Sequence, residues 1–302
     1  MDNVLKKLFY KFFNKSSYLT LKNKNRTEKN LKYYNEKIYT QITNIQKKIE
    51  NNKIITFLHS GQLGDLIYSL ASIKEIAKTH KCKLYLQINK PIPEDYVVDS
   101  KKVYISKRSA DLILPLLREQ NFLETVDVYN NEEIDVNLDL FRDIPINLSF
   151  YSTRWFSHIL GININVNDTF LSVKPHKQIK NKIVIHRSPR YRNAFINYEF
   201  LNTSEDLLCI GLEHEFQALR KEIKNLEFYD CRNFLEMAEI IQASKFYIGN
   251  MSMQYIIAEA LKAPRLLEAS PDFPIVFPVG ANAFDAYHQN HFENFFNKLN
   301  KI

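Results

Sequence analysis

From Lys53 onward, short runs of hydrophobic residues alternate with segments in which hydrophobic residues recur at helical spacing. This alternation predicts a parallel β-sheet whose strands are connected by helices. In the first half of this region the pattern predicts strands over residues 54–58, 83–88, 126–129 and 134–138, a helix after residue 64 and a helix over 150–160. Gly161 then ends the second helix.

The segment Ser172–Lys182 breaks the pattern, because it holds Pro175 and four lysines and no periodic hydrophobic positions. A second alternation follows, with strands expected over 183–185, 207–211, 226–229, 246–248 and 265–268 and helices over 214–223, 234–243, 252–261 and 283–299. We therefore expect an α/β protein of two Rossmann-like domains facing a cleft, residues 53–172 and 173–282, followed by a C-terminal helix over 283–302.

Residues 1–52 form a separate basic helical arm. They hold twelve Lys and Arg against four Asp and Glu, a net charge of +8, so the rest of the chain, with 29 basic and 30 acidic side chains, carries −1. One helical face carries Leu5, Leu8, Phe9, Phe12 and Phe13, with lysines on or beside the other face. Such a helix can lie on an anionic membrane surface or dock on the body through the same face. A second, polar helix over 28–49 connects it to the body.

Composition limits the class of protein. With 45% hydrophobic and 25% charged residues the chain resembles ordinary soluble proteins, and no apolar run is long enough to cross a bilayer. Three cysteines without Cys-x-x-Cys spacing fit reduced thiols, so we expect a cytoplasmic protein, with the arm as a means of peripheral attachment to the inner face of the membrane. The nearly neutral body argues against a nucleic-acid partner.

The first motif, His59-Ser-Gly61-Gln62-Leu-Gly64-Asp65, connects the first predicted strand to the first helix. It is neither a dinucleotide fingerprint nor a P-loop. In a chain with only six glycines, two within four residues of one another indicate a backbone requirement at the edge where an open α/β sheet binds its ligand. Asp65 can cap the helix, or it can act as a general base at the floor of the cleft.

The second motif places Arg187, Arg190 and Arg192 within six residues after the first strand of the second half, together with Ser188. Arginine forks and a hydroxyl are suited to phosphate oxygens, whereas the usual alternative is a solvated charged run. Because this run follows a strand that ends at the predicted cleft, we favour anion binding.

Two further strand ends carry polar residues. Asn250, Ser252 and Gln254 lie at a strand-to-helix turn, whose backbone N–H groups suit a diphosphate, although Asn250 or Ser252 can also be simple helix caps. Glu213, just after Gly211, can accept hydrogen bonds from a ribose or a base, or be an exposed acid at a helix start.

These residues carry a family resemblance. The body resembles GT-B-fold glycosyltransferases, and most of all the ADP-heptose:lipopolysaccharide heptosyltransferases of glycosyltransferase family 9. The turn Gly61–Asp65 is similar to that family's early motif, and the segments Gly249–Ser252 and Ala258–Pro264 are similar to its late donor-binding motif. Met251 stands where the family commonly has Asp and Ile256 where it commonly has His, so ADP-heptose itself need not be the donor.

The resemblance implies a glycosyltransferase that moves a sugar from a nucleotide-diphosphate donor to a glycan or lipid-linked acceptor in lipopolysaccharide, capsule or other surface polysaccharide synthesis. It implies inverting transfer without a metal or other cofactor. Asp65 would be the base, on the acceptor side with Gly61, Gln62 and Gly64, and the second-half residues named above would bind the donor.

Two other classes remain open. A nucleotide-sugar epimerase or hydrolase can use the same architecture, because fold does not determine chemistry. A non-catalytic protein that binds membranes or nucleic acid would explain the basic arm, but the body is not basic and no aromatic residues are interleaved with arginine as in a nucleic-acid-binding module.

Overall fold

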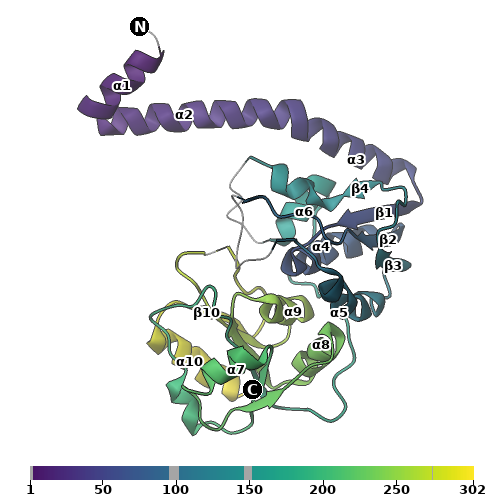
Figure 1. The fold of residues 1–302 in the computed structure, drawn as a ribbon, viewed down its shortest axis with the longest axis vertical. Coiled ribbons are helices and arrows are strands. Elements are labelled where there is room, and N and C mark those ends of the chain that lie inside the picture. Colours follow the sequence, from purple (N-terminus) through teal and green to yellow (C-terminus); the bar gives the residue numbers. More distant parts are fainter. Residues whose placement is uncertain (1–2, 95–101, 146–151, 274) are drawn as a thin grey trace.

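The computed structural model describes residues 3–94, 102–145, 152–273 and 275–302. It contains two parallel β-sheets, one from each half of the chain after residue 53 (Figure 1). The first sheet has the order β3-β2-β1-β4 and the second the order β10-β9-β8-β5-β6-β7. The prediction of an α/β protein with parallel sheets is therefore confirmed.

The first sheet and its connections consist of β1 (Ile54–His59), α4 (Leu63–Ile76), β2 (Lys81–Leu86), α5 (Lys107–Arg118), β3 (Thr125–Val128), β4 (Val136–Asn137), the short 3₁₀ helix η3 (Leu138–Asp143) and α6 (Thr153–Leu160). Phe57 and Leu84, paired across β1 and β2, are fully buried. The sequence pattern did not lead us to predict helix α5. Its signals are nevertheless present, because Ser106 is its N-cap and its buried residues recur at helical spacing. The predicted helix start at Phe150 lies outside the described residues.

The second sheet and its connections consist of β5 (Ile183–His186), η4 (Glu199–Thr203), β6 (Leu207–Ile210), α7 (Glu213–Leu219), β7 (Glu227–Tyr229), α8 (Phe234–Ala243), β8 (Phe246–Asn250), α9 (Met253–Leu261), β9 (Arg265–Glu268), β10 (Ala283–Ala286) and α10 (Gln289–Asn300). The predicted helix over 283–299 is wrong at its beginning. Residues 283–286 form a strand that pairs with β9, because Ala283–Ala286 continues the sheet before His288 precedes α10.

One hydrophobic cluster connects the two sheets. Helix α4 packs on α9 and α5 packs on α8, which places helices of the two halves side by side (Figure 1). Buried residues of both halves, such as Leu66, Ile113, Ile241 and Ile257, belong to the same cluster. The two sheets are thus held together by apolar packing.

The N-terminal segment forms α1 (Asn3–Phe13), α2 (Lys15–Tyr33), the π-helical turn η1 (Tyr34–Ile38) and α3 (Tyr39–Asn51). Figure 1 shows α1 and α2 projecting away from both sheets. Helix α2 contains no buried residue, whereas Ile38, Ile42 and Ile45 are buried in the main hydrophobic cluster. Contact with the body begins at Asn30, which donates a hydrogen bond to the Pro145 carbonyl, and the residues from Ile38 onward are packed into the cluster. The division of the chain at residue 52 stays a prediction.

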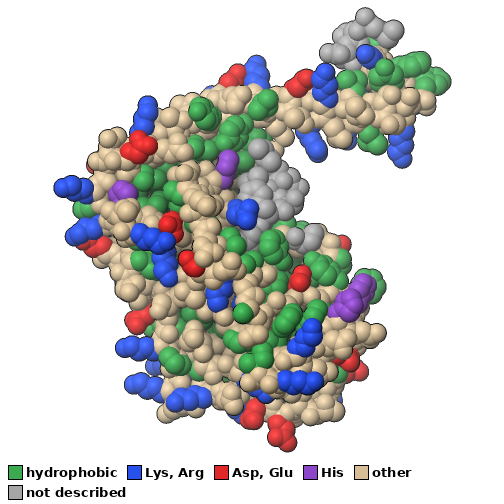
Figure 2. Space-filling view, turned by 180° about the vertical axis from the view of Figure 1, so that it is seen from behind, with side chains coloured by type: hydrophobic (Ala, Val, Ile, Leu, Met, Phe, Trp, Pro, Cys, Tyr) green, Lys and Arg blue, Asp and Glu red, His purple; other side chains and the backbone are tan. Residues whose placement is uncertain are grey.

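The hydrophobic face of α1 is exposed. Leu5 is 59% exposed, and Phe12 and Phe13 are 75% and 77% exposed. Figure 2 shows hydrophobic side chains gathered towards the end of the projecting arm, with lysine and arginine side chains along it. In the structure this face of α1 does not pack on the body. Among the described helices none is long and apolar enough to span a bilayer.

Candidate functional site

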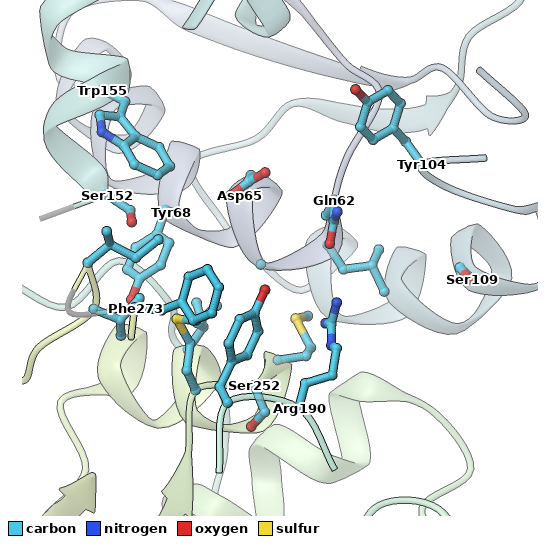
Figure 3. Close-up of a pocket in the computed structure, with 18 of the residues that line it drawn as sticks. Gln62, Asp65, Tyr68, Tyr104, Ser109, Ser152, Trp155, Arg190, Ser252 and Phe273 are labelled. Atoms are coloured by element: carbon cyan, nitrogen blue, oxygen red, sulfur yellow. The ribbon is translucent and has the colours of Figure 1, made fainter. Parts of the chain in front are cut away.

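A cavity of about 800 Å³ lies between the two halves of the molecule (Figure 3). It opens beyond the carboxyl ends of β1, β5 and β8, the edge where parallel α/β sheets bind ligands. The first half contributes Gln62, Leu63, Gly64, Asp65, Tyr68, Lys102, Val103, Tyr104, Ser106, Ser109, Phe141, Ser152 and Trp155. The second half contributes Arg190, Tyr191, Met251, Ser252, Met253, Ile256, Phe273, Ile275 and Val276.

The loop between β1 and α4 forms the floor of the cavity on the first-half side. Gly61 has a φ of +98°, in the left-handed region that glycine adopts without a steric penalty. At Gly64 an added Cβ would lie 2.5 Å from Cδ1 of Ile256, so glycine allows the start of α4 to approach α9. The two glycines therefore shape the loop and bring Asp65 to the boundary between the halves.

Asp65 lies in the first turn of α4 with its side chain 24% exposed, and it lines the cavity (Figure 3). Burial raises the pKa of its carboxyl group above the ordinary value, while the Arg142 guanidinium and a backbone hydrogen bond from Gln62 act in the opposite direction. The hydrogen bond from Gln62 agrees with a capping role, and the position in the cavity agrees with a general base. Both roles assigned from the sequence are compatible with this geometry.

The three arginines of the second motif have different environments. The Arg187 guanidinium is buried and donates hydrogen bonds to Glu222, to Glu268 and to the Ile196 carbonyl, so all of its nitrogens are occupied by protein. Arg190 lines the cavity and lies over the Tyr191 ring. Arg192 is exposed and donates its Nε hydrogen to the Ser188 carbonyl. Only Arg190 of the three is placed to meet a ligand in this cavity, because the Arg187 side chain turns into the protein.

Asn250 holds the loop that carries Arg190. Its side chain is completely buried, accepts a hydrogen bond from the Ser188 backbone N–H at 2.9 Å and donates to the carbonyls of Ser188 and Arg190. The Ser188 hydroxyl in turn accepts from the Arg190 backbone N–H at 3.2 Å. Asn250 and Ser188 therefore shape the loop, and neither is part of the cavity lining.

Ser252 is the N-cap of α9 and lines the cavity. Its Oγ accepts a hydrogen bond from the Tyr255 backbone N–H and lies 3.2 Å from Nδ1 of His186, while Nε2 of His186 lies 3.0 Å from Glu215. His186, at the end of β5, thus links α7 to the start of α9. The cavity thus meets a helix N-terminus, which favours an anion.

Glu213 and Gln254 do not line this cavity. Glu213 is exposed in the first turn of α7, where it accepts a hydrogen bond from Gln217, and Gln254 is buried on α9. Their predicted contacts with the donor are therefore not supported by this cavity.

The sequence analysis missed the aromatic side chains of the cavity and the charged residues behind them. Tyr104, Phe141, Trp155, Tyr191 and Phe273 line it; Phe141 stacks on Trp155, and Tyr191 meets Phe273 edge to face. Behind them lie Asp139 and Arg142, which follow the predicted strand 134–138. Because strand ends meet at the cleft, the sequence could have predicted that Asp139 and Arg142 lie near it. The local sequence pattern does not indicate that the aromatic residues line the cavity.

The described residues contain no group of three or more His, Cys, Asp or Glu side chains able to hold a metal ion. The rings of His288 and His291, near the start of α10, have centroids 6.3 Å apart, but no third such ligand joins them among the described residues. The expectation that no metal or other cofactor is needed stays a prediction.

No protein-family model and no curated protein sequence matches this chain. Solved structures do match, and one of them is described as a glycosyl transferase of family 9. A member of this family from Veillonella parvula superposes with a TM-score of 0.54 at 9% identity, covering 83% of this chain and 90% of that protein.

The heptosyltransferase WaaC of E. coli, in a complex with ADP, superposes with a TM-score of 0.51 at 11% identity, covering 82% of this chain and 99% of WaaC. These likenesses confirm the resemblance predicted from the sequence at the level of fold. At such low identity they define the architecture, and the chemistry has to be argued from the residues of the cavity.

Proposed function

We propose that the protein is a glycosyltransferase that moves a sugar from a nucleotide-diphosphate donor to a glycan or lipid-linked acceptor, in lipopolysaccharide, capsule or other surface polysaccharide synthesis. One observation carries this proposal. A single cavity has a carboxylate, Asp65, on one wall and a helix N-terminus with a cation, Ser252 and Arg190, on the other. The first suits the acceptor hydroxyl and the second suits the departing diphosphate.

The proposed reaction is metal-independent inverting transfer. Asp65 takes the proton of the acceptor hydroxyl while the acceptor oxygen bonds to the anomeric carbon and the bond to the diphosphate breaks. Arg190 and the N-terminus of α9 stabilise the negative charge that develops on the leaving diphosphate. The WaaC neighbour was solved with ADP, which supports a nucleoside diphosphate as the product. The aromatic side chains of the cavity suit the apolar faces of sugar rings.

Product analysis tests this function. The protein is incubated with a panel of nucleotide sugars, with and without an acceptor extract of lipid-linked glycans, and the products are identified by mass spectrometry. Nucleoside diphosphate and extended acceptor, formed only when both substrates are present, support transfer. Free sugar or an isomerised nucleotide sugar without acceptor would instead establish a hydrolase or an epimerase.

Arg190→Ala is expected to weaken nucleoside diphosphate binding by about 1.5–3 kcal/mol, roughly 10- to 150-fold, because a hydrogen bond to a charged group is lost. Calorimetric titration with ADP, UDP and GDP measures this change. Arg192→Ala is the matched control, since Arg192 is exposed outside the cavity lining and should leave the affinity unchanged. Equal affinities in wild type and both variants would remove the second motif from the donor site.

We also propose that the protein is cytoplasmic and attaches to the inner face of the membrane through α1. The exposed face of Leu5, Leu8, Phe9, Phe12 and Phe13 would enter the headgroup region, and the basic side chains of residues 1–52 would attract anionic lipids. This location would bring a lipid-linked acceptor close to the cavity.

Deletion of residues 1–33 is expected to abolish sedimentation with vesicles that contain phosphatidylglycerol and to preserve the fold, because the buried residues of α3 remain. Deletion of residues 1–52 should also destabilise the body, since burial of each of Ile38, Ile42 and Ile45 is worth about 1.5–3 kcal/mol. Thermal melts compare the two shortened chains. Vesicle binding by the chain that begins at Tyr34 would contradict the proposal, as would binding of the full chain to neutral vesicles with equal affinity.

A further inference from the structure

Asp139, directly after β4, is a buried carboxylate surrounded by donors. It is 6% exposed and accepts hydrogen bonds from the Ser60 backbone N–H at 3.2 Å, from the Ser60 hydroxyl, from Lys90 Nζ at 2.7 Å and from Arg142 Nη1 at 2.5 Å. Burial by itself would raise the pKa of Asp139, but the donors and cations around the carboxylate hold it well below its usual range. Asp139 is therefore an ionised and fixed anchor.

Arg142 is held by this anchor in one orientation. Residues 139 and 142 lie one turn apart on η3, which places the guanidinium beside the Asp139 carboxylate. The guanidinium carbon also lies 4.5 Å from the centroid of the Tyr104 ring and 4.5 Å from that of the Phe141 ring. Two cation–π contacts and an ion pair leave the side chain little rotational freedom.

The remaining end of the Arg142 guanidinium points at Asp65. Nη2 lies 3.5 Å from Oδ2 of Asp65, is buried, and makes no hydrogen bond within the part of the chain that the structure describes. A buried N–H group without a hydrogen bond costs free energy unless a nearby negative charge compensates for it. Asp65 is the carboxylate in position to supply that charge.

The charges near Asp65 come from several elements. Asp139 and Arg142 lie on η3, and Lys90 lies in the segment after β2. The charge of Lys90 neutralises that of Asp139, so the positive charge of Arg142 remains to compensate Asp65. At the end of β1, burial lowers the pKa of His59 to about 3, so this imidazole is neutral. Arg142 therefore supplies the compensating charge on the first-half side.

The helices packed against Asp65 from other directions add little net charge near its carboxylate. On α4, burial raises the pKa of Tyr68 well above its usual value, so its hydroxyl is neutral. On α9, Glu259 is ion-paired with Lys262 and Arg265. Arg190 faces the same cavity from the second half.

We propose that Arg142 is a positioning residue for the transfer reaction: anchored by Asp139, it orients the Asp65 carboxylate toward the cavity and keeps it ionised. The inference rests on the proposed function, in which Asp65 takes the proton of the acceptor hydroxyl. Burial alone would leave Asp65 protonated over a wider pH range, and a protonated carboxyl group cannot act as a base. The positive charge of Arg142 favours the ionised form of Asp65, although Arg142 does not line the cavity.

The test measures the ionisation of Asp65 directly. In protein labelled with ¹³C at aspartate side chains, the Asp65 signal is the one that disappears in Asp65→Asn, and its shift is followed against pH. Arg142→Gln should raise the titration midpoint by about 1–3 pH units, the usual effect of losing an opposite charge at this distance. Arg142→Lys keeps the cation and the fold but not the reach of the guanidinium, so it should give a smaller rise.

Arg118→Gln is the control, because Arg118 is an exposed residue paired with Asp127 on the same half and should leave the Asp65 midpoint unchanged. An unchanged midpoint in Arg142→Gln would overturn the proposal. The second measurement is the rate of nucleoside diphosphate release against pH, whose acidic limb should move with the midpoint. A midpoint that moves while the rate profile stays in place would support the electrostatic role of Arg142 and overturn the role of Asp65 as base.

Discussion

Asp65→Asn is expected to lower turnover by about 10²- to 10⁴-fold, the usual contribution of a positioned general base. The melting temperature should fall only moderately, because Asn fills the same volume and can keep the hydrogen bond from the Gln62 backbone N–H, whereas Arg142 loses the charge of its ion-pair partner. Donor affinity should also be nearly unchanged, since the proposed donor contacts lie on the other half of the cavity. A transfer assay under saturating donor, with a thermal melt of the same preparation, measures both quantities.

Two further variants separate catalysis from capping. Asp65→Ala also removes the hydrogen bond from the Gln62 backbone N–H, so it should be less stable than Asp65→Asn by about 0.5–1.5 kcal/mol. Asp127→Asn changes an exposed aspartate of β3 in the same half and should alter neither. If Asp65→Asn turns over like wild type while Asp65→Ala melts early, Asp65 is a helix cap and the mechanism needs another base.

Arg187→Ala is expected to destabilise the protein by about 3–5 kcal/mol, the cost of removing one partner from a buried ion pair. Glu268 is completely buried, and two of its hydrogen bonds come from Arg187. Without the guanidinium this buried carboxylate would keep the hydrogen bond from the Asn193 backbone N–H, at 2.6 Å, but lose both hydrogen bonds from Arg187. Denaturant unfolding monitored by circular dichroism measures the change.

A double variant decides whether the loss comes from the ion pair. Arg187→Met combined with Glu268→Gln removes both charges and should recover part of the stability lost in Arg187→Met alone. Loss of nucleotide binding in an Arg187 variant would then be secondary to unfolding, unlike the loss expected for Arg190→Ala. A stable Arg187→Ala protein with weakened nucleotide binding would instead restore Arg187 to the donor site.

The strands and most helices could be predicted because buried parallel strands have continuous hydrophobic runs. Helix α8 and strand β9 have the predicted bounds. Helix α5 was not predicted because Pro115 interrupts its sequence near the C-terminal end, although Ala110 and Ile113 in the preceding turns are buried at helical spacing. Strand β10 was not predicted because its short segment is followed almost directly by the hydrophobic pattern of α10, and the two were interpreted as one helix.

The site could be predicted in part, since strand ends in a parallel sheet meet at one edge. This rule correctly brought Asp65, Arg190 and Ser252 to one cavity. It could not distinguish Arg187 from Arg190, because the direction of each side chain depends on carboxylates such as Glu268 that are distant in the sequence. Three of the aromatic wall residues, Tyr104, Tyr191 and Phe273, come from irregular segments without periodicity.

The apolar packing of α4 on α9 and of α5 on α8 has a consequence for how ligands enter and leave. Two domains joined by a small polar interface commonly swing about a hinge, whereas here such a rotation would expose residues of a shared hydrophobic cluster to water. We therefore expect the cavity to keep a nearly constant width. Ligand exchange would then proceed through movements of side chains and loops in the cavity lining, such as those of Tyr191 and Phe273, and little binding free energy would be consumed in closing one half upon the other.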